Sequence, residues 1–135
     1  MIRRCMLLIA LLLALCLPAQ AEPDPLLAPV EQALAEPLAL LTPAVDAPFA
    51  RAAYEIALTE PLSEAVQPFY GEYVRVIVVE YGYYEVYPIL SSQLLAVGVK
   101  ADGSLEPCLT PGELLARTYD RTLLRDLPIQ PLAVE

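Results

Sequence analysis

The β-branched run from Val74 to Val79 restricts the fold of this 135-residue chain more than any other feature. Valine and isoleucine favour an extended backbone, and we predict a strand from Glu72 to Tyr81. Successive side chains of a strand point to opposite faces, and here both sets are largely apolar. A strand that is apolar on both faces is typically a central one, covered on each side. The sequence therefore predicts a sheet organised around this strand.

The segment after this strand predicts a hairpin that turns at Gly82. A two-residue turn would place Glu80 opposite a second glutamate, and like charges in opposed positions destabilise a sheet. We therefore expect a three-residue loop, which pairs Glu80 with Tyr84 and Val78 with Val86.

Further segments extend this hairpin into a meander. Pro88 has no N–H for the ladder, so the second strand ends there, bulges or lies at an edge of the sheet. A third strand is predicted from Leu94 to Lys100. Asp102-Gly103 is a hairpin signal that leads into a short fourth strand from Leu105 to Leu109. Together these segments predict an antiparallel sheet of three to four strands over about residues 72–109.

Two helices are expected to pack on this sheet and to give an α+β fold. The N-terminal helix is predicted over about residues 47–58, because Asp46 is a suitable N-cap, Pro48 fits the first turn and the following residues are rich in alanine. The C-terminal helix is predicted over about residues 111–126. It follows Thr110-Pro111-Gly112-Glu113, a capping box with proline at the first helical position.

After the first 21 residues, the sequence divides into a linker-like segment and one domain. Residues 22–45 are rich in proline, alanine and leucine, and we expect an arm or linker that is either docked on the domain or flexible. Short helices are expected from Pro29 to about Glu36 and from Pro61 to Gln67. Residues 46–135 are expected to form a single α+β domain, large enough for a modest core.

Residues 1–21 have the three parts of a secretory signal peptide. Two arginines precede an apolar core from Cys5 to Leu17, and Ala19-Gln20-Ala21 is a cleavage site of small residues. The core is shorter than the roughly 20 residues that cross a bilayer, and an uncleaved anchor or a lipid anchor at Cys16 is the alternative. We expect cleavage and an exported product, either periplasmic or secreted. The leader, the use of arginine in preference to lysine, and the high content of alanine, leucine and proline favour a bacterial source with a GC-rich genome.

The charge of the mature chain disfavours nucleic acid and membrane partners. The full chain has 17 acidic and 8 basic residues and a net charge of −9, and loss of the two leader arginines lowers the net charge to −11. Phosphate backbones and anionic lipids repel such a chain. We therefore expect no nucleic-acid partner and no membrane association after cleavage.

Residue types that the sequence lacks exclude several kinds of catalytic site. Histidine is absent, which excludes histidine-based triads and the usual mononuclear zinc sites. We expect no metal site and no cofactor. Cys108 alone remains after the leader is removed, so no internal disulfide can form. It is expected to be a buried structural thiol, with a reactive thiol or an intermolecular bridge as the alternatives.

Aromatic and charged residues of the predicted sheet form the first candidate binding surface. Flat rings mixed with a few charges are typical of such surfaces. The alternative is structural: the rings cover the edge of a small core, while Arg75 stacks on a ring or pairs with Glu85. The candidate ligand or partner residues are Tyr73, Arg75, Tyr81, Glu85 and Tyr87.

Basic residues of the predicted C-terminal helix form the second candidate surface. Arg117, Arg121 and Arg125 recur at every fourth residue and line one side of the helix. They would dock an acidic partner or bind an anion. The alternative is a solvated helix face, on which Glu113 pairs with Arg117.

These features favour an exported, non-catalytic binding or accessory protein with an unknown protein or small-molecule partner. The sequence has no Gly-x-Ser-x-Gly motif and no glycine-rich phosphate loop. The alternative is a small hydrolase or lyase that uses Glu80, Glu85 and Tyr87, because two carboxyl groups at a set distance can hydrolyse a glycosidic bond. A structural envelope component, tethered through the proline-rich arm, is a third hypothesis.

Overall fold

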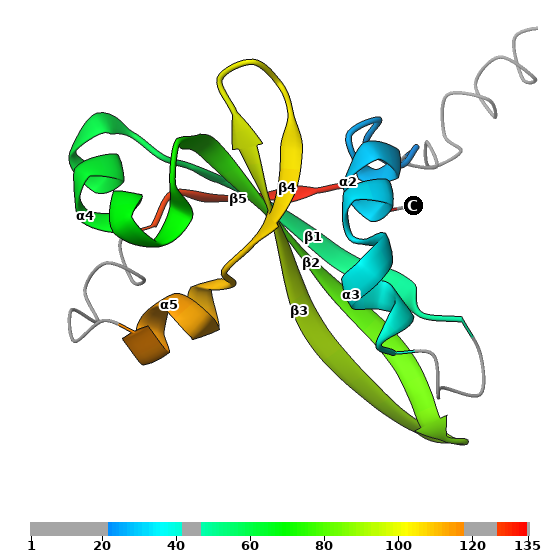
Figure 1. Ribbon diagram of the computed structural model, residues 1–135. Coiled ribbons are helices and arrows are strands. Elements are labelled where there is room, and N and C mark those ends of the chain that lie inside the picture. Colours follow the sequence, from blue (N-terminus) through cyan, green and yellow to red (C-terminus); the bar gives the residue numbers. More distant parts are fainter. Residues whose placement is uncertain (1–21, 42–46, 118–126, 135) are drawn as a thin grey trace, which may run out of the picture.

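The computed structural model describes residues 22–41, 47–117 and 127–134, and the predicted signal peptide lies outside these ranges. The described residues form a mixed helix and strand fold with one antiparallel sheet in the order β4-β3-β2-β1-β5 (Figure 1). The strands are β1 (Phe49–Ala57), β2 (Tyr73–Val86), β3 (Ile89–Lys100), β4 (Leu105–Cys108) and β5 (Ile129–Leu132). The helices are α2 (Leu27–Ala33), α3 (Ala35–Ala39), α4 (Glu60–Tyr70) and α5 (Pro111–Arg117).

The predicted α+β class is confirmed, but the sheet has five strands instead of three to four. β2, β3 and β4 fall in the predicted range of residues 72–109, and β2 has the central position that its two apolar faces predict. β1 and β5 extend the sheet on one side. None of the helices within the described ranges is long and apolar enough to cross a membrane.

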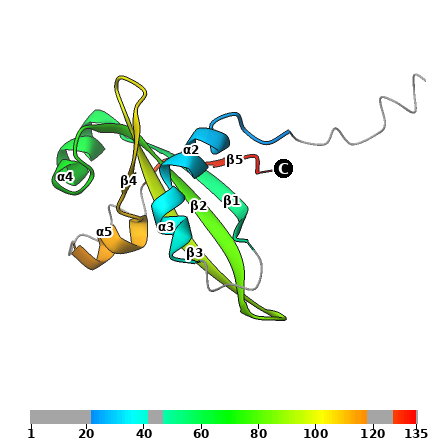
Figure 2. The same ribbon diagram turned by 45° about the vertical axis from the view of Figure 1, so that its right-hand side comes forward.

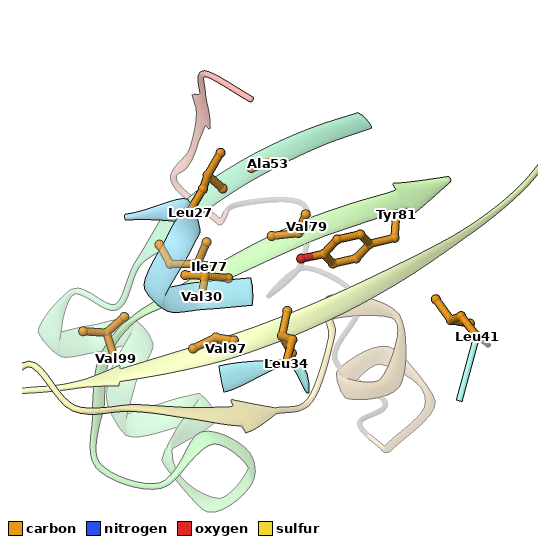
Figure 3. Packing of buried hydrophobic residues seen from close by; sticks show 10 residues of the cluster. All are labelled: Leu27, Val30, Leu34, Leu41, Ala53, Ile77, Val79, Tyr81, Val97 and Val99. Carbon is orange, nitrogen blue, oxygen red and sulfur yellow. The ribbon is translucent and has the colours of Figure 1, made fainter. Parts of the chain in front are cut away.

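Helices cover both faces of the sheet, so the sheet lies between two separate apolar clusters. α2 and α3 cover one face, hereafter the α2 face, and α4 and α5 cover the other, the α4 face (Figure 1). The buried residues on the α2 face are Leu27, Val30, Leu34, Leu41, Ala53, Ile77, Val79, Tyr81, Val97 and Val99 (Figure 3). Those on the α4 face are Ile56, Val66, Tyr70, Tyr73, Val76, Val78, Ala96, Leu114 and Leu127.

α2 and α3 lie within the segment that the sequence predicts as an arm or linker. Pro29 stands in the first turn of α2, where its missing N–H costs no helical hydrogen bond. Leu27, Val30 and Leu34 are at most 6% exposed and pack against the sheet (Figure 3). The backbone N–H of Asp24 also donates a hydrogen bond of 2.9 Å to the carbonyl of Ala133, so the two ends of the described chain lie together.

β1 corrects the prediction of an N-terminal helix over residues 47–58. Phe49–Ala57 is a strand that pairs with β2 along its length and with β5 on its other edge. Its alanines have high helix propensity. However, Ala53 is buried on the α2 face and Ile56 on the α4 face, as the alternation of a strand between two neighbours requires. Tertiary pairing therefore outweighs local propensity in this segment.

The turn of the β2–β3 hairpin lies at Tyr87-Pro88, and the prediction of a turn at Gly82 is wrong. β2 continues to Val86, and Gly82 pairs with Phe49 of β1 and with Ser92 of β3. The Tyr87–Pro88 peptide bond is cis. Gly82 is therefore an interior strand residue.

Both predicted cross-strand pairs of this hairpin are wrong as a consequence. Val78 pairs with Ala96, and Glu80 pairs with Leu94. Of the three roles expected for Pro88, the end of the strand is the one observed. The hairpin is longer than predicted and projects beyond the helices (Figure 1).

The remaining described elements match the sequence more closely. The β3–β4 hairpin turns at the predicted Asp102-Gly103, where Gly103 has a φ angle of 87°. α4 includes the predicted short helix and runs past Pro68 to Tyr70.

α5 begins with the predicted capping box. The Glu113 N–H donates to Thr110 Oγ1 at 3.2 Å, and the Thr110 N–H donates to Glu113 Oε2 at 2.7 Å. The structure describes α5 as far as Arg117, and the rest of the predicted helix, residues 118–126, lies outside the described residues.

Candidate functional site

The five candidate residues of the sheet do not share one face. Tyr73 belongs to the buried cluster on the α4 face, and Tyr81 belongs to the cluster on the α2 face. They are 9% and 1% exposed. The pairing of β2 with β3 shifts at a bulge between Tyr73 and Arg75, and one extra residue changes the side to which the preceding side chains point. Strict alternation, on which the prediction depends, therefore fails at the start of β2.

Arg75 pairs with a different glutamate from the one that the sequence suggests. Its Nη1 atom lies 3.1 Å from Oε1 of Glu55, on the neighbouring strand β1. Glu85 is exposed and falls at a second bulge, between Tyr84 and Val86, close to the hairpin turn. Arg75 therefore links β1 and β2, away from Glu85.

Tyr73 contacts β3 and β4, which lie on the side of β2 away from β1. Its ring lies over Gly98 of β3, where a Cβ atom would be 2.4 Å from the ring. Its hydroxyl donates a hydrogen bond to Glu106 Oε1 of β4, and Lys100 Nζ lies 3.4 Å from the other carboxylate oxygen. Burial and the bond to Glu106 raise the pKa of Tyr73, and the same hydrogen bond lowers the pKa of Glu106. Tyr73 therefore ties the central strand to the edge strand β4.

An exposed aromatic group lies near the turn of the β2–β3 hairpin. The ring centroids of Phe49 and Tyr84 are 6.4 Å apart, and those of Tyr84 and Tyr87 are 5.5 Å apart. Phe49 is 43% exposed and Tyr87 is 69% exposed. Leu90, which pairs with Tyr84, and Leu94 on the same face are 38% and 44% exposed. We call these five residues the aromatic shelf.

Gly82 makes room for the aromatic shelf. A Cβ atom at Gly82 would lie 2.9 Å from Cζ of Phe49 and 2.7 Å from Cδ of Arg51. Both side chains therefore lie across the strand at this point. Arg51 Nη1 is 3.8 Å from Glu80 Oε1. On β2, Glu80 lies between the shelf residue Tyr84 and Val78 of the buried cluster on the α4 face, and it pairs with Leu94 of the shelf.

The lengths of the strands explain why the shelf is exposed. β2 and β3 have 14 and 12 residues, whereas β4 and β5 have 4 each. β4 pairs with β3 only over Ala96–Val99, and the rest of the hairpin projects beyond α4 and α5 (Figure 2). Apolar side chains at its end consequently meet solvent.

The carboxylates that the sequence suggests for catalysis are far apart. Glu80 and Glu85 lie on the same extended strand, and a rise of about 3.3 Å per residue places them roughly 16 Å apart. Glycosidases hold their two carboxyl groups about 5 to 9.5 Å apart. Glu80 is also engaged by Arg51. This pair therefore lacks the spacing that glycoside hydrolysis requires.

Cys108 is half-buried at the end of β4, and its Sγ atom lies 3.6 Å from the carbonyl oxygen of Leu109. Burial raises the pKa of this thiol to about 12, and the charges of Glu113 and Glu106 act in the same direction. A thiol with a raised pKa carries little thiolate at neutral pH and is a weak nucleophile.

The structure describes no group of three or more side chains of the types that bind metal ions. Asp102 in the β3–β4 turn accepts hydrogen bonds from the Ser104 hydroxyl at 2.6 Å and from the Ser104 N–H at 2.9 Å. These bonds lower the pKa of Asp102. Its carboxylate therefore caps the turn.

The second predicted surface lies at the limit of the described residues. Arg117 is the last residue of α5, and its side chain is outside the description. Arg121 and Arg125 fall within residues 118–126, which are also outside it. A docking role for the three arginines therefore stays a prediction.

Of the five residues of the aromatic shelf, only Tyr87 is among the candidate binding residues that the sequence predicts. Phe49 falls in the segment with helix propensity, and the place of Tyr84 depends on the register of the hairpin. Gly82 carried a usable signal, because glycine inside a strand often marks the close approach of a neighbouring group. The chain matches no protein-family model, no curated protein and no solved structure, so the geometry of the shelf is the basis for a functional proposal.

Proposed function

We propose that this protein is an exported, non-catalytic binding or accessory module that contacts its partner through the aromatic shelf. The observation that carries the proposal is the contact of the half-buried Tyr84 ring with the exposed rings of Phe49 and Tyr87 near the end of the hairpin. Aromatic rings are enriched in contact surfaces because they bury a large area and lose little conformational entropy. The leader over residues 1–21 supports export.

The chemistry around the shelf indicates the kind of partner. Leu90 and Leu94 widen the apolar area, and the Arg51–Glu80 ion pair forms a polar border on one side. The shelf itself carries no charge, although the whole chain has a net charge of −9. A partner protein with apolar side chains on its own contact surface fits this arrangement.

Site-specific cross-linking in the exporting cell tests the binding surface. A benzoylphenylalanine in place of Tyr87 should give discrete adducts with a partner protein, because this ring is 69% exposed on the shelf. The same group in place of Val74 is the matched control, since Val74 is 47% exposed on the same strand but far from the shelf. Adding Tyr84→Ser should abolish the adducts from position 87. The proposal is wrong if positions 74 and 87 give the same adducts, or if position 87 gives none.

Fractionation tests export separately. The wild-type chain should accumulate outside the cytoplasm with Glu22 as its first residue, as measured by intact mass. Replacing Arg3 and Arg4 by glutamate removes the basic start of the leader and should leave the uncleaved chain in the cytoplasm. An uncleaved wild-type chain, or a lipid attached at Cys16, would contradict release by cleavage after Ala21.

A further inference from the structure

One edge of β3 is open over much of its length. β3 pairs with β2 from Ile89 to Lys100 but with β4 only over Ala96–Val99. Among the strands that the structure describes, none pairs with the outer edge of Ile89–Leu95. Alternate residues of an antiparallel strand direct both N–H and C=O to the same side, so this edge presents a row of backbone donors and acceptors. A groove of about 190 Å³ lies beside Gln93, Leu94 and Leu95, and Pro37, Thr110 and Glu113 also line it.

Other strand edges of the sheet have features that limit further pairing. β4 contains Pro107 and β5 contains Pro131, and each of these strands has only 4 residues. Where β1 extends beyond β5, it carries a bulge at Arg51. Short edges, proline, bulges and charged side chains are the usual protection against association of edges. The segment Ile89–Leu95 contains no proline, no glycine and no charged residue.

The sequence of this open edge is complementary to itself. If two copies align antiparallel about Ser92, Leu90 of one copy faces Leu94 of the other, and Ile89 faces Leu95. Ser91 faces Gln93, and Ser92 faces its own counterpart. Apolar residues therefore meet apolar residues and polar residues meet polar ones, which is the requirement for a two-fold contact between identical surfaces.

We propose that β3 pairs with β3 of a second copy of this chain through Ile89–Leu95, in an antiparallel register centred on Ser92. The two sheets then become one continuous sheet. Residues Ile89–Leu95 carry no charge, so this register opposes no like charges along the edge, although each chain has a net charge of −11 once the leader is removed. Leu90 and Leu94 of both copies meet on the face that carries the aromatic shelf, so the dimer joins two shelves into one larger apolar surface. This inference goes beyond the proposed function and does not depend on it.

The oligomeric state of the chain from Glu22 onward, measured by sedimentation velocity over a range of concentrations, is the first test. The wild-type chain should be a dimer that does not grow further, because a two-fold contact uses the open edge of each copy. Ser92→Lys places two ammonium groups opposite each other and should raise the dissociation constant at least about tenfold. Val74→Lys, at an exposed position of β2 away from the edge, should leave the dimer unchanged. Circular dichroism verifies that both variants are folded.

A disulfide tests the register even where a lysine variant fails to fold. Ser92→Cys in a Cys108→Ala background should form a covalent dimer with oxidised glutathione, because directly opposed residues have Cα atoms about 4.5 to 5.5 Å apart, within the range that a disulfide bridges. Ser104→Cys in the same background is the control, since Ser104 is exposed in the β3–β4 turn. A monomeric wild-type chain, a dimer that survives Ser92→Lys, or equal cross-linking at positions 92 and 104 would overturn the inference.

Discussion

Two glycines inside the central strands provide space for a neighbouring side chain. A Cβ atom at Gly82 would collide with Phe49 and Arg51, and one at Gly98 would lie 2.4 Å from the ring of Tyr73. Neither glycine has a positive φ angle, whereas Gly71 and Gly103 do. The requirement for glycine at positions 82 and 98 is therefore steric and comes from residues that are distant in the sequence.

Gly98→Ala should destabilise the protein by about 1 to 3 kcal/mol, the usual cost of inserting a methyl group into a packed site. The ring of Tyr73 cannot keep its position over β3 once position 98 carries a Cβ atom. Its hydrogen bond to Glu106 should weaken as a result, and the pKa of Glu106 should rise toward its ordinary value. Urea denaturation measures the first effect, and an NMR titration of the Glu106 carboxyl measures the second.

Gly112→Ala is the matched control for this substitution. The nearest atom to a Cβ at Gly112 is Thr110 Oγ1 at 3.9 Å, and the residue lies in the first turn of α5. Alanine favours a helix over glycine by up to about 1 kcal/mol, so stability should be unchanged or slightly higher. Equal losses at positions 98 and 112 would show that the Tyr73 ring is not tightly packed against β3.

Elements with local determinants could be predicted from the sequence, and elements held by distant partners could not. The capping box at Thr110 and Glu113 and the turn at Asp102-Gly103 depend on residues within a few positions of each other, and both are observed. β1 is a strand because β2 and β5 flank it. Its alanine-rich sequence alone favours a helix.

The candidate site could be predicted less well than the fold because it depends on bulges and on a turn. A bulge moves Tyr73 to the face opposite Tyr81, and alternation along the sequence gives no sign of it. The turn at Tyr87-Pro88 places Leu90 beside Tyr84. With a turn at Gly82, Tyr84 and Leu90 would not be paired across two strands. The aromatic shelf is therefore a product of the hairpin register.

Leu34→Ala should lower the free energy of unfolding by about 2 to 5 kcal/mol, the range for leucine to alanine in a packed core. Leu34 joins α2 to α3, is 1% exposed and contacts the cluster on the α2 face (Figure 3). Leu40, six residues further along, is 82% exposed. Leu40→Ala is the matched control and should change stability by less than about 0.5 kcal/mol.

Chemical denaturation of both variants decides whether these helices are part of the cooperative unit. A small effect of Leu34→Ala, similar to that of Leu40→Ala, would mean that α2 and α3 behave as a detachable arm. A large effect with one transition would mean that they unfold together with the sheet.

The molecule as a whole buries several weak acids in its two apolar clusters. Tyr70 and Tyr73 lie in the cluster on the α4 face, and Cys108 packs against the same cluster. Tyr81 lies in the cluster on the α2 face. Burial raises the pKa of all four groups above their ordinary values, in the case of Tyr81 to about 12. The folded protein therefore retains these protons at pH values where the unfolded chain releases them.

Stability should consequently fall in alkaline solution. These groups contribute their full stabilising effect below their ordinary pKa values, 9.0 for the thiol and 10.0 for the phenols. The effect is lost as the pH rises through those values toward the raised ones, because deprotonation then favours the unfolded chain. The thermal midpoint should be constant near pH 8 and should decrease steadily above about pH 10. The part of the phenolate absorbance that comes from Tyr70, Tyr73 and Tyr81 should appear together with unfolding.

Tyr81→Phe separates one contribution from the others. The Tyr81 hydroxyl is buried and has no hydrogen-bond partner among the described residues, and a buried polar group without a partner costs about 1 to 3 kcal/mol. Phenylalanine should raise stability at neutral pH by about 1 kcal/mol and reduce the alkaline loss. An alkaline loss identical to that of the wild-type chain would contradict a role for this hydroxyl.

The hydrogen bond between the Asp24 N–H and the Ala133 carbonyl bears on where a tag or a surface attachment can be placed. Because it brings both ends of the described chain to one corner beside α2, a tag or fluorophore at either end would occupy the same place (Figure 1). The tip of the β2–β3 hairpin lies at a different corner. Immobilisation through either end therefore leaves the shelf and the open edge of β3 free, and a short peptide joining the ends would permit new termini at the β3–β4 turn.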